Sequence, residues 1–299
     1  MTPDAFRYAR PGSLDEAVAL LGDAGALARV LAGGQSLIPL LAQRLLRPEL
    51  VVDINRIPGL DQIELLPDCV RMGALVRQEQ ARLSPLVRMH VPGLSQALDW
   101  VASPGIRERG TVIGNLIANA PAAELPAVAL ALGARFVVRD GTGGHVLAAA
   151  ELLGSGKRLG PDALATHVLW PRTPGLGGFY EVARRDGHAP VVGAMVRVAA
   201  KHCCVGLCGV AAVGMACPTV AHGLFARWPQ IPATAELDRL LEQDLSEPLF
   251  GTAFVDAAYR REVAPVVIQR AAAAAAGADV GVGVGADTHA GAGAGASRA

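Results

Sequence analysis

The sequence has no excess of charge of either sign. Lys and Arg together number 27, and so do Asp and Glu, so the formal net charge is zero. Binding to a nucleic-acid backbone depends on a basic surface, and this composition does not supply one. We therefore expect no nucleic-acid partner.

The sequence also lacks a segment that could cross a membrane. Its longest apolar stretch, residues 203–221, contains several glycines and Pro218, whereas a spanning helix needs about 20 consecutive apolar residues. We interpret this stretch as two buried strands and a turn. Residues 1–10 lack the apolar core of a secretion signal, so we expect a cytoplasmic protein without a transmembrane segment, with its five cysteines reduced.

Cysteine and histidine do not occur at the spacing of a metal site. Cys203 and Cys208 have the first spacing of a plant-type iron–sulfur loop, but residue 211, which would be the third ligand, is alanine. The seven histidines form no pair with a zinc-binding spacing. We expect neither a cluster nor a metal ion on this chain.

Two glycine-rich stretches match nucleotide-binding motifs only in part. Residues 154–157 lack the first glycine and the final Ser or Thr of a P-loop. Residues 281–285 mimic a dinucleotide fingerprint, but they lie in an Ala/Gly-rich stretch without a flanking strand or helix. The composition predicts an Ala/Gly-rich tail over residues 273–299, disordered from about Gly277, after a helix that ends in the alanine run 271–276.

A glycine pair, Gly33-Gly34, makes the first candidate for binding a phosphate. It follows an apolar run with strand character, residues 27–31, and precedes a segment with helical spacing that starts near Ser36. Glycine permits positive φ and leaves the main chain uncovered. Successive N–H groups in such a turn, together with a helix N-terminus, can hold an anion. The alternative is a strand-to-helix turn in which the glycines serve geometry alone.

Residues 106–116 are the second candidate. Gly110 and Gly114 flank a β-branched run, and Asn115 offers an amide. Taken alone, this pattern favours a strand with tight ends, so we expect both glycine-rich loops to lie at strand ends. Two converging main-chain loops would suit a dinucleotide, which has two phosphates and an extended body.

The remaining pattern mixes helices and strands without a regular βαβ repeat, which predicts an α+β fold. Residues 13–16 form a capping box at the start of a helix. We expect two short helices between residues 78 and 100, interrupted near Pro92. The other predicted elements are a buried strand at 51–54, a strand pair at 62–66 and 69–72, a helix from Glu124 to Leu132 and a strand from Arg135 to Val138.

Several short motifs, taken in order, resemble those of the FAD-binding medium subunits of molybdenum hydroxylases, the family of aerobic carbon monoxide dehydrogenase and xanthine dehydrogenase. Residues 32–37 resemble the first flavin-binding motif of that family, and residues 107–116 look like the second. The resemblance extends over roughly residues 6–270. Further matching segments are 121–124, 130–134 and 181–185.

The resemblance implies the fold and its division into domains. Residues 1–175 would form a two-lobed FAD-binding domain of the vanillyl-alcohol-oxidase/PCMH type. A smaller α+β domain of a sheet plus helices would follow over residues 176–272. The isoalloxazine ring of the FAD would lie between the two domains.

The resemblance also implies the residues that bind the cofactor. The main chain of both loops would hold the pyrophosphate, and Glu124 takes the position of an acidic residue near the cofactor. Leu37, Ile113 and Val101 would form apolar walls near the ring. We expect no catalytic residue and no metal ligand on this chain. The expected cofactor-binding residues are Ala32, Gly33, Gly34, Gln35, Ser36, Leu37, Thr111, Val112, Ile113, Gly114, Asn115 and Glu124.

The implied function is electron transfer in a heterotrimer or a dimer of heterotrimers. Electrons would pass from [2Fe–2S] clusters on a small subunit through FAD to an external acceptor, while a large subunit holds the molybdenum cofactor. Two alternatives stay open. Ile113 stands where the family usually has glycine, and positive φ there would disfavour a β-branched residue, so the chain could be a flavin-free structural subunit. It could also be a stand-alone flavin oxidoreductase.

Overall fold

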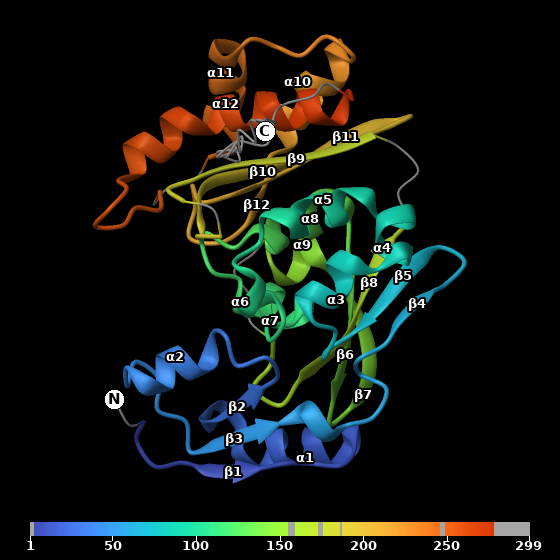
Figure 1. The fold of residues 1–299 in the computed structure, drawn as a ribbon, viewed down its shortest axis with the longest axis vertical. Helices are drawn as coiled ribbons and strands as arrows, with labels where there is room; N and C mark the ends of the chain where they lie inside the picture. The colour runs from blue at the N-terminus through green and yellow to red at the C-terminus, as the bar shows by residue number, and fades with distance from the viewer. Residues whose placement is uncertain (1–2, 155–158, 173–175, 186, 246–248, 278–299) are drawn as a thin grey trace, which may run out of the picture.

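The computed structural model describes residues 3–154, 159–172, 176–185, 187–245 and 249–277, which form three sheets with helices packed against them. The sheets follow one another along the long axis of the molecule in chain order (Figure 1). The fold is α+β, as the sequence predicts.

The first lobe is built on a small parallel sheet in the order β1-β3-β2. Helix α1 begins where Ser13 accepts a hydrogen bond from the Glu16 N–H, as the capping box predicts. The elements of this lobe are β1 (Arg7–Ala9), α1 (Leu14–Ala24), β2 (Ala28–Leu31), α2 (Leu37–Ala42) and β3 (Leu50–Asp53), with 3-10 turns η1 (Gly25–Leu27) and η2 (Ile54–Arg56).

The second lobe is an antiparallel sheet in the order β4-β5-β8-β6-β7 with helices on one side. It shares one hydrophobic core with the first lobe, and this core extends from Ala17 of α1 to Met195 in the last sheet. Its strands are β4 (Ile63–Leu65), β5 (Cys69–Gly73), β6 (Arg135–Asp140), β7 (Gly143–Ala148) and β8 (Leu164–Pro171). Its helices are α3 (Gln78–Leu83), α4 (Pro85–His90), α5 (Pro92–Trp100), α6 (Pro104–Arg107), α7 (Val112–Ala118), α8 (Glu124–Leu132) and α9 (Ala149–Leu152).

Two helix predictions in this lobe need correction. Residues 78–100 form three helices rather than two, because Ser84 as well as Val91 precedes a proline and leaves helical geometry. Residues 112–118 form helix α7 and not a strand. Thr111 caps this helix by accepting the Gly114 N–H, so the β-branched run begins its first turn. Only the first glycine-rich loop therefore follows a strand.

The last part of the chain is an antiparallel sheet in the order β12-β11-β10-β9, covered on one side by three helices. The predicted pair of strands in residues 203–221 is only partly right, because Pro218 begins helix α10 directly after the two-residue strand β12. The elements are β9 (Leu176–Ala183), β10 (Pro190–Ala199), β11 (His202–Cys208), β12 (Met215–Ala216), α10 (Pro218–Arg227), α11 (Thr234–Asp244) and α12 (Ala257–Ala275).

This sheet is packed between helices from two parts of the chain. Helix α12 lies on one face and α8 of the preceding lobe on the other (Figure 1). Glycines admit both helices: a Cβ at Gly178 would lie 2.2 Å from the Ala271 carbonyl oxygen, and one at Gly206 would lie 1.9 Å from that of Ala127. The main chains thus approach directly.

The end of the chain agrees with the prediction as far as the structure describes it. Helix α12 ends at Ala275, within the alanine run. The predicted disordered segment after Gly277 lies outside the described residues. In the described ranges, every helix is too short or too polar to span a membrane.

Candidate functional site

The first glycine-rich loop is a tight turn between β2 and α2. Gly34 has φ +73°, and a Cβ there would lie 3.1 Å from Cγ1 of Ile38. The Ile38 N–H donates to the Gly34 carbonyl at 3.0 Å. Among the described residues, no acceptor is recorded for the N–H groups of residues 34–37. The turn therefore presents four main-chain donors in succession.

The second loop is held by residues 76–78, which lead into helix α3. The Gln78 N–H donates to the Gly110 carbonyl at 2.8 Å, and the Val112 N–H donates to the Val76 carbonyl at 3.0 Å. The Thr111 hydroxyl accepts the Gly114 N–H at 2.9 Å. This arrangement fixes the entry of α7 on both sides of Thr111.

The two loops touch each other at Gly33. A Cβ on Gly33 would lie 2.3 Å from the Arg109 carbonyl oxygen and 3.0 Å from both Gly110 Cα and Thr111 N. Glycine is thus required for the main chains to meet. Figure 1 shows the loop after β2 directly beneath α6 and α7. Segments almost eighty residues apart in sequence form one main-chain surface.

The expected cofactor residues in these loops differ in exposure. Gln35 and Ser36 are exposed at the tip of the first loop, and Ala32, Gly33, Gly34 and Leu37 are half-buried. Val112 and Ile113 are buried in the hydrophobic core, so only their main chain is available to a ligand. Asn115 is half-buried, and its Oδ1 atom is inaccessible and has no partner among the described residues.

Ile113 adopts a helical conformation in the first turn of α7. The replacement of the family's glycine therefore carries no cost from positive φ, and the side chain fills the core. The presence of Ile113 therefore no longer supports the alternative of a flavin-free subunit.

Glu124 lies at the N-terminus of α8 and is only 4% exposed. Burial raises its pKa, and burial together with the negative charge of Glu124 raises the pKa of Glu181 on β9. Both charges also act on the buried thiol of Cys208 on β11. The structure thus places Glu124 against the last sheet, and its contact with a cofactor stays a prediction.

Arg107 in the second motif is buried and serves as an anchor. Its Nε atom donates to Glu79 at 2.7 Å, and its Nη1 atom donates to the carbonyls of Val101 and Ala102 at 2.9 and 2.7 Å. Hydrogen bonds from Arg82 and Arg107 lower the pKa of Glu79 to about 2. Val101, expected as a wall near the ring, is itself buried.

Two residues that sequence reasoning missed connect the loops. Asn55 donates from Nδ2 to the Ala32 carbonyl at 2.9 Å, and Arg77 donates from Nη1 to the Arg109 carbonyl at 2.8 Å. Arg77 Nη2 also donates to Asn55 Oδ1 at 2.8 Å. The one available signal was the position of Asn55 just after a predicted buried strand.

Asp53, at the end of β3, orients Asn55. Its Oδ1 atom accepts the Asn55 N–H at 2.9 Å and Nδ2 at 2.6 Å. Its Oδ2 atom accepts the Tyr8 hydroxyl and lies 3.5 Å from Nε of Arg10. Burial opposes ionisation, but hydrogen bonds from Tyr8 and Asn55 outweigh it and lower the pKa of Asp53. The network thus extends from β1 to the second loop.

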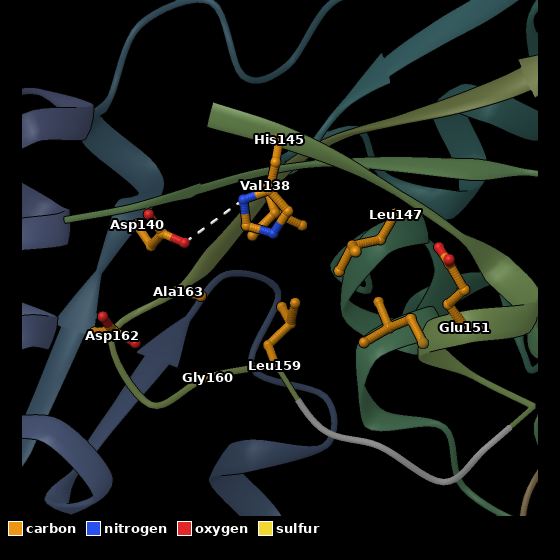
Figure 2. A pocket seen from close by; sticks show the side chains of 10 residues that line it. Val138, Asp140, His145, Leu147, Glu151, Leu159, Gly160, Asp162 and Ala163 are labelled. Atoms are coloured by element: carbon orange, nitrogen blue, oxygen red, sulfur yellow. Dashed lines mark ion pairs between the residues drawn. The ribbon is translucent and has the colours of Figure 1, made fainter. Parts of the chain in front are cut away.

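Two hollows lie away from the loops. One, of about 200 Å³, lies beside the β6–β7 hairpin, where Nδ1 of His145 lies 3.5 Å from Oδ2 of Asp140 (Figure 2). The other, of about 420 Å³, lies between β11 and α10 and is lined in part by Cys203, Cys204 and Cys217. In the part of the chain that the structure describes, no group of three or more His, Cys, Asp or Glu side chains could hold a metal ion.

Comparison with known proteins gives consistent matches. Residues 4–173 match the family model described as the FAD binding domain in molybdopterin dehydrogenase. Caffeine dehydrogenase subunit beta of Pseudomonas sp. strain CBB1 is 35% identical over 91% of this chain and 95% of its own length. The carbon monoxide dehydrogenase medium chain of Afipia carboxidovorans is 31% identical over 91% and 96%.

A solved structure is similar over nearly the whole fold. The carbon monoxide dehydrogenase of Hydrogenophaga pseudoflava that lacks the Mo-pyranopterin moiety superposes with a TM-score of 0.86 at 29% identity. The match covers 93% of this chain and 99% of the other. The similarity therefore includes the last sheet and its helices as well as the two lobes.

Proposed function

Because the chain belongs to the family of FAD-binding domains in molybdopterin dehydrogenases, we propose that it is the electron-transfer subunit of a molybdenum hydroxylase complex. As a family member it is an FAD-binding medium subunit and an oxidoreductase flavoprotein. The route of the electrons and the composition of the complex are the proposal.

The main-chain contact at Gly33 carries the assignment of the binding site. It joins the N–H groups of residues 34–37 to the loop that begins α7. A diphosphate bound there would accept hydrogen bonds from these groups. Exposed Gln35 and Ser36 would add side-chain donors.

FAD, when bound, supplies a group that accepts electrons singly or in pairs, and the protein supplies its position and electrostatic surroundings. We assign residues 1–175 to the FAD-binding domain and residues 176–272 to the second domain. Of the predicted tail, residues 273–299, the first three still belong to helix α12. Residues 4–173, which match the family model, end two residues before the boundary between the two domains. Glu124 at the interface of the two would lie near the bound cofactor.

We further propose that electrons reach the FAD from [2Fe–2S] clusters on a small subunit and leave to an external acceptor. A large subunit would hold the molybdenum cofactor, in a heterotrimer or a dimer of heterotrimers. The words "medium chain" and "subunit" in the names of the relatives support such an assembly. All five cysteines are free, which favours a reducing, cytoplasmic location.

The flavin content of the purified full-length chain tests this function. We expect a bound flavin with its visible absorption, released as FAD on denaturation, at about one per chain. A protein without flavin after purification and reconstitution would contradict the proposal. Turnover of a small organic substrate by the isolated chain would favour a stand-alone oxidoreductase instead.

A further inference from the structure

One chain of hydrogen bonds connects the two residues that directly precede the first glycine of each glycine-rich loop. It extends from the Ala32 carbonyl through the side chains of Asn55 and Arg77 to the Arg109 carbonyl, in steps of 2.9, 2.8 and 2.8 Å. Asn55 uses both ends of its amide, and Arg77 uses both terminal nitrogens. We call Asn55 and Arg77 together the clamp.

The clamp fixes the orientation of a peptide group at the start of each loop. In a trans peptide the C=O and the following N–H point in opposite directions. Because the Ala32 carbonyl points toward Asn55, the Gly33 N–H points away from the clamp. The Arg109 carbonyl is held in the same way by Arg77, whose main chain forms an isolated bridge with Thr111.

In the part of the chain that the structure describes, hydrogen bonds connect the two loops through the clamp and not directly. Among the described residues, no main-chain hydrogen bond connects residues 32–37 with residues 109–115. The contact at Gly33 prevents closer approach but does not prevent the loops from separating or sliding. The clamp supplies the attraction and the directionality that this contact lacks.

Asp53 holds Asn55 of the clamp in its orientation. Asp53 accepts two hydrogen bonds from Asn55, and Tyr8 and Arg10 hold the other oxygen of Asp53. A rotation of the Asn55 side-chain amide would therefore break several hydrogen bonds at once. Such a support is typical of side chains that position others for binding.

We propose that Asn55 and Arg77 are positioning residues that set the spacing and register of the two loops for the diphosphate of FAD. This inference rests on the proposed function. It assigns no direct contact between the clamp and the cofactor. Its consequence is that loss of the clamp weakens FAD binding more than it weakens the fold.

The test measures FAD affinity and thermal unfolding of the full-length protein with the variants Arg77→Met and Asn55→Leu. We expect the dissociation constant for FAD, from titration of the flavin-stripped protein, to rise about 10- to 100-fold in each, the loss expected for one or two hydrogen bonds to a charged donor. The double variant should lose no more than the worse single variant, because the bonds form one chain. The unfolding midpoint without FAD should change little.

Arg77→Lys separates geometry from charge. Lysine keeps the positive charge but cannot bridge two acceptors as the guanidinium does, so we expect it to lose most of the affinity. Arg71→Met is the matched control, because Arg71 forms its ion pair with Glu64 on β4 and β5, away from the loops. This control should bind FAD like the wild type.

Three results would overturn the inference. They are unchanged FAD affinity in Arg77→Met and Asn55→Leu, full affinity in Arg77→Lys, and a fall in the FAD-free unfolding midpoint large enough to account for the lost affinity. A wild-type protein that binds no FAD would instead refute the proposed function. The two failures are therefore distinguishable.

Discussion

Gly33 lies where the two loops meet, and any side chain there would have to displace main-chain atoms of residues 109–111. Neighbouring Gly34 meets a different constraint, since its φ of +73° is one that other residues adopt at a cost. The two glycines thus have separate roles. One permits contact between the loops, and the other permits the turn.

Gly33→Ala should reduce FAD binding, because its Cβ would lie 2.3 Å from the Arg109 oxygen and force the loops apart. We expect at least about a 10-fold weaker affinity, since misplacing a binding group by about 1 Å can cost up to 100-fold. Fluorescence titration of the stripped protein with FAD measures this. Gly22→Ala in α1 is the control, because nothing lies within 4 Å of its Cβ. Equal affinity in both variants would contradict the role of Gly33.

Gly34→Val should abolish flavin retention while leaving the fold largely intact. A β-branched residue is strained at φ +73°, and its Cβ would also lie 3.1 Å from Ile38. Flavin content after gel filtration and the far-ultraviolet circular dichroism spectrum measure the two effects separately. Retained flavin in a folded variant would show that the turn is not needed for binding.

At the scale of the elements, the helices under the second loop are joined by charged side chains that are buried or half-buried. Arg107 at the end of α6 and Arg82 of α3 share the carboxylate of Glu79. Their hydrogen bonds lower the pKa of Glu79 to about 2. Because its pKa in the unfolded chain is about 4.3, this carboxylate stabilises the fold above that pH, and the contribution is lost as pH falls toward 2.

Glu79→Gln should therefore destabilise the protein at neutral pH and matter little in acid. We expect a loss of about 1–3 kcal/mol at pH 7, allowing for partial screening by solvent. The difference from the wild type should shrink between pH 4 and 2. Urea unfolding at a series of pH values measures it. A difference that does not depend on pH would mean that charge is not its cause.

Sequence patterns predict elements well where local and tertiary preferences agree. Helix α8 has the predicted bounds from Glu124 to Leu132, because helix formers and a following glycine act together. Helix α7 was missed because Thr111, Val112 and Ile113 favour a strand by propensity. The Thr111 cap and burial of the run in the core override that preference.

The clamp could not be predicted, for a different reason. Asn55 and Arg77 are 22 residues apart and belong to no local motif. Each bonds to the residue before the first glycine of a loop, namely Ala32 or Arg109, and those contacts exist only after four segments have come together. Resemblance to a family identifies the loops but not the side chains that hold them in register.

At the scale of the whole molecule, the interface between α8 and the last sheet contains two carboxyl groups. Glu124 and Glu181 are each 4% exposed, and burial raises the pKa of both. Above about pH 4.3, these two groups thus hold more protons in the folded protein than in the unfolded chain. Their contribution to stability falls as pH rises from there through the raised pKa values. Cys208 and Arg260 are the other titratable groups at this place.

Glu181→Gln should stabilise the FAD-free protein at alkaline pH, because it removes the cost of ionising a buried pair. We expect a gain on the order of 1–3 kcal/mol near pH 9 and almost none near pH 4, where both carboxyl groups are protonated in either state. Chemical unfolding of wild type and variant across this range measures the gain. A variant as sensitive to alkali as the wild type would contradict the role of the pair.

The last sheet takes one of its two covers from α12 and the other from α8, which precedes it by more than forty residues. Cutting the gene between β8 and β9 would therefore expose to water the apolar face of the last sheet that α8 covers. The segment that starts at β9 would therefore not fold easily when fused to an unrelated protein. The two parts should accordingly pass from ancestor to descendant as a single heritable unit.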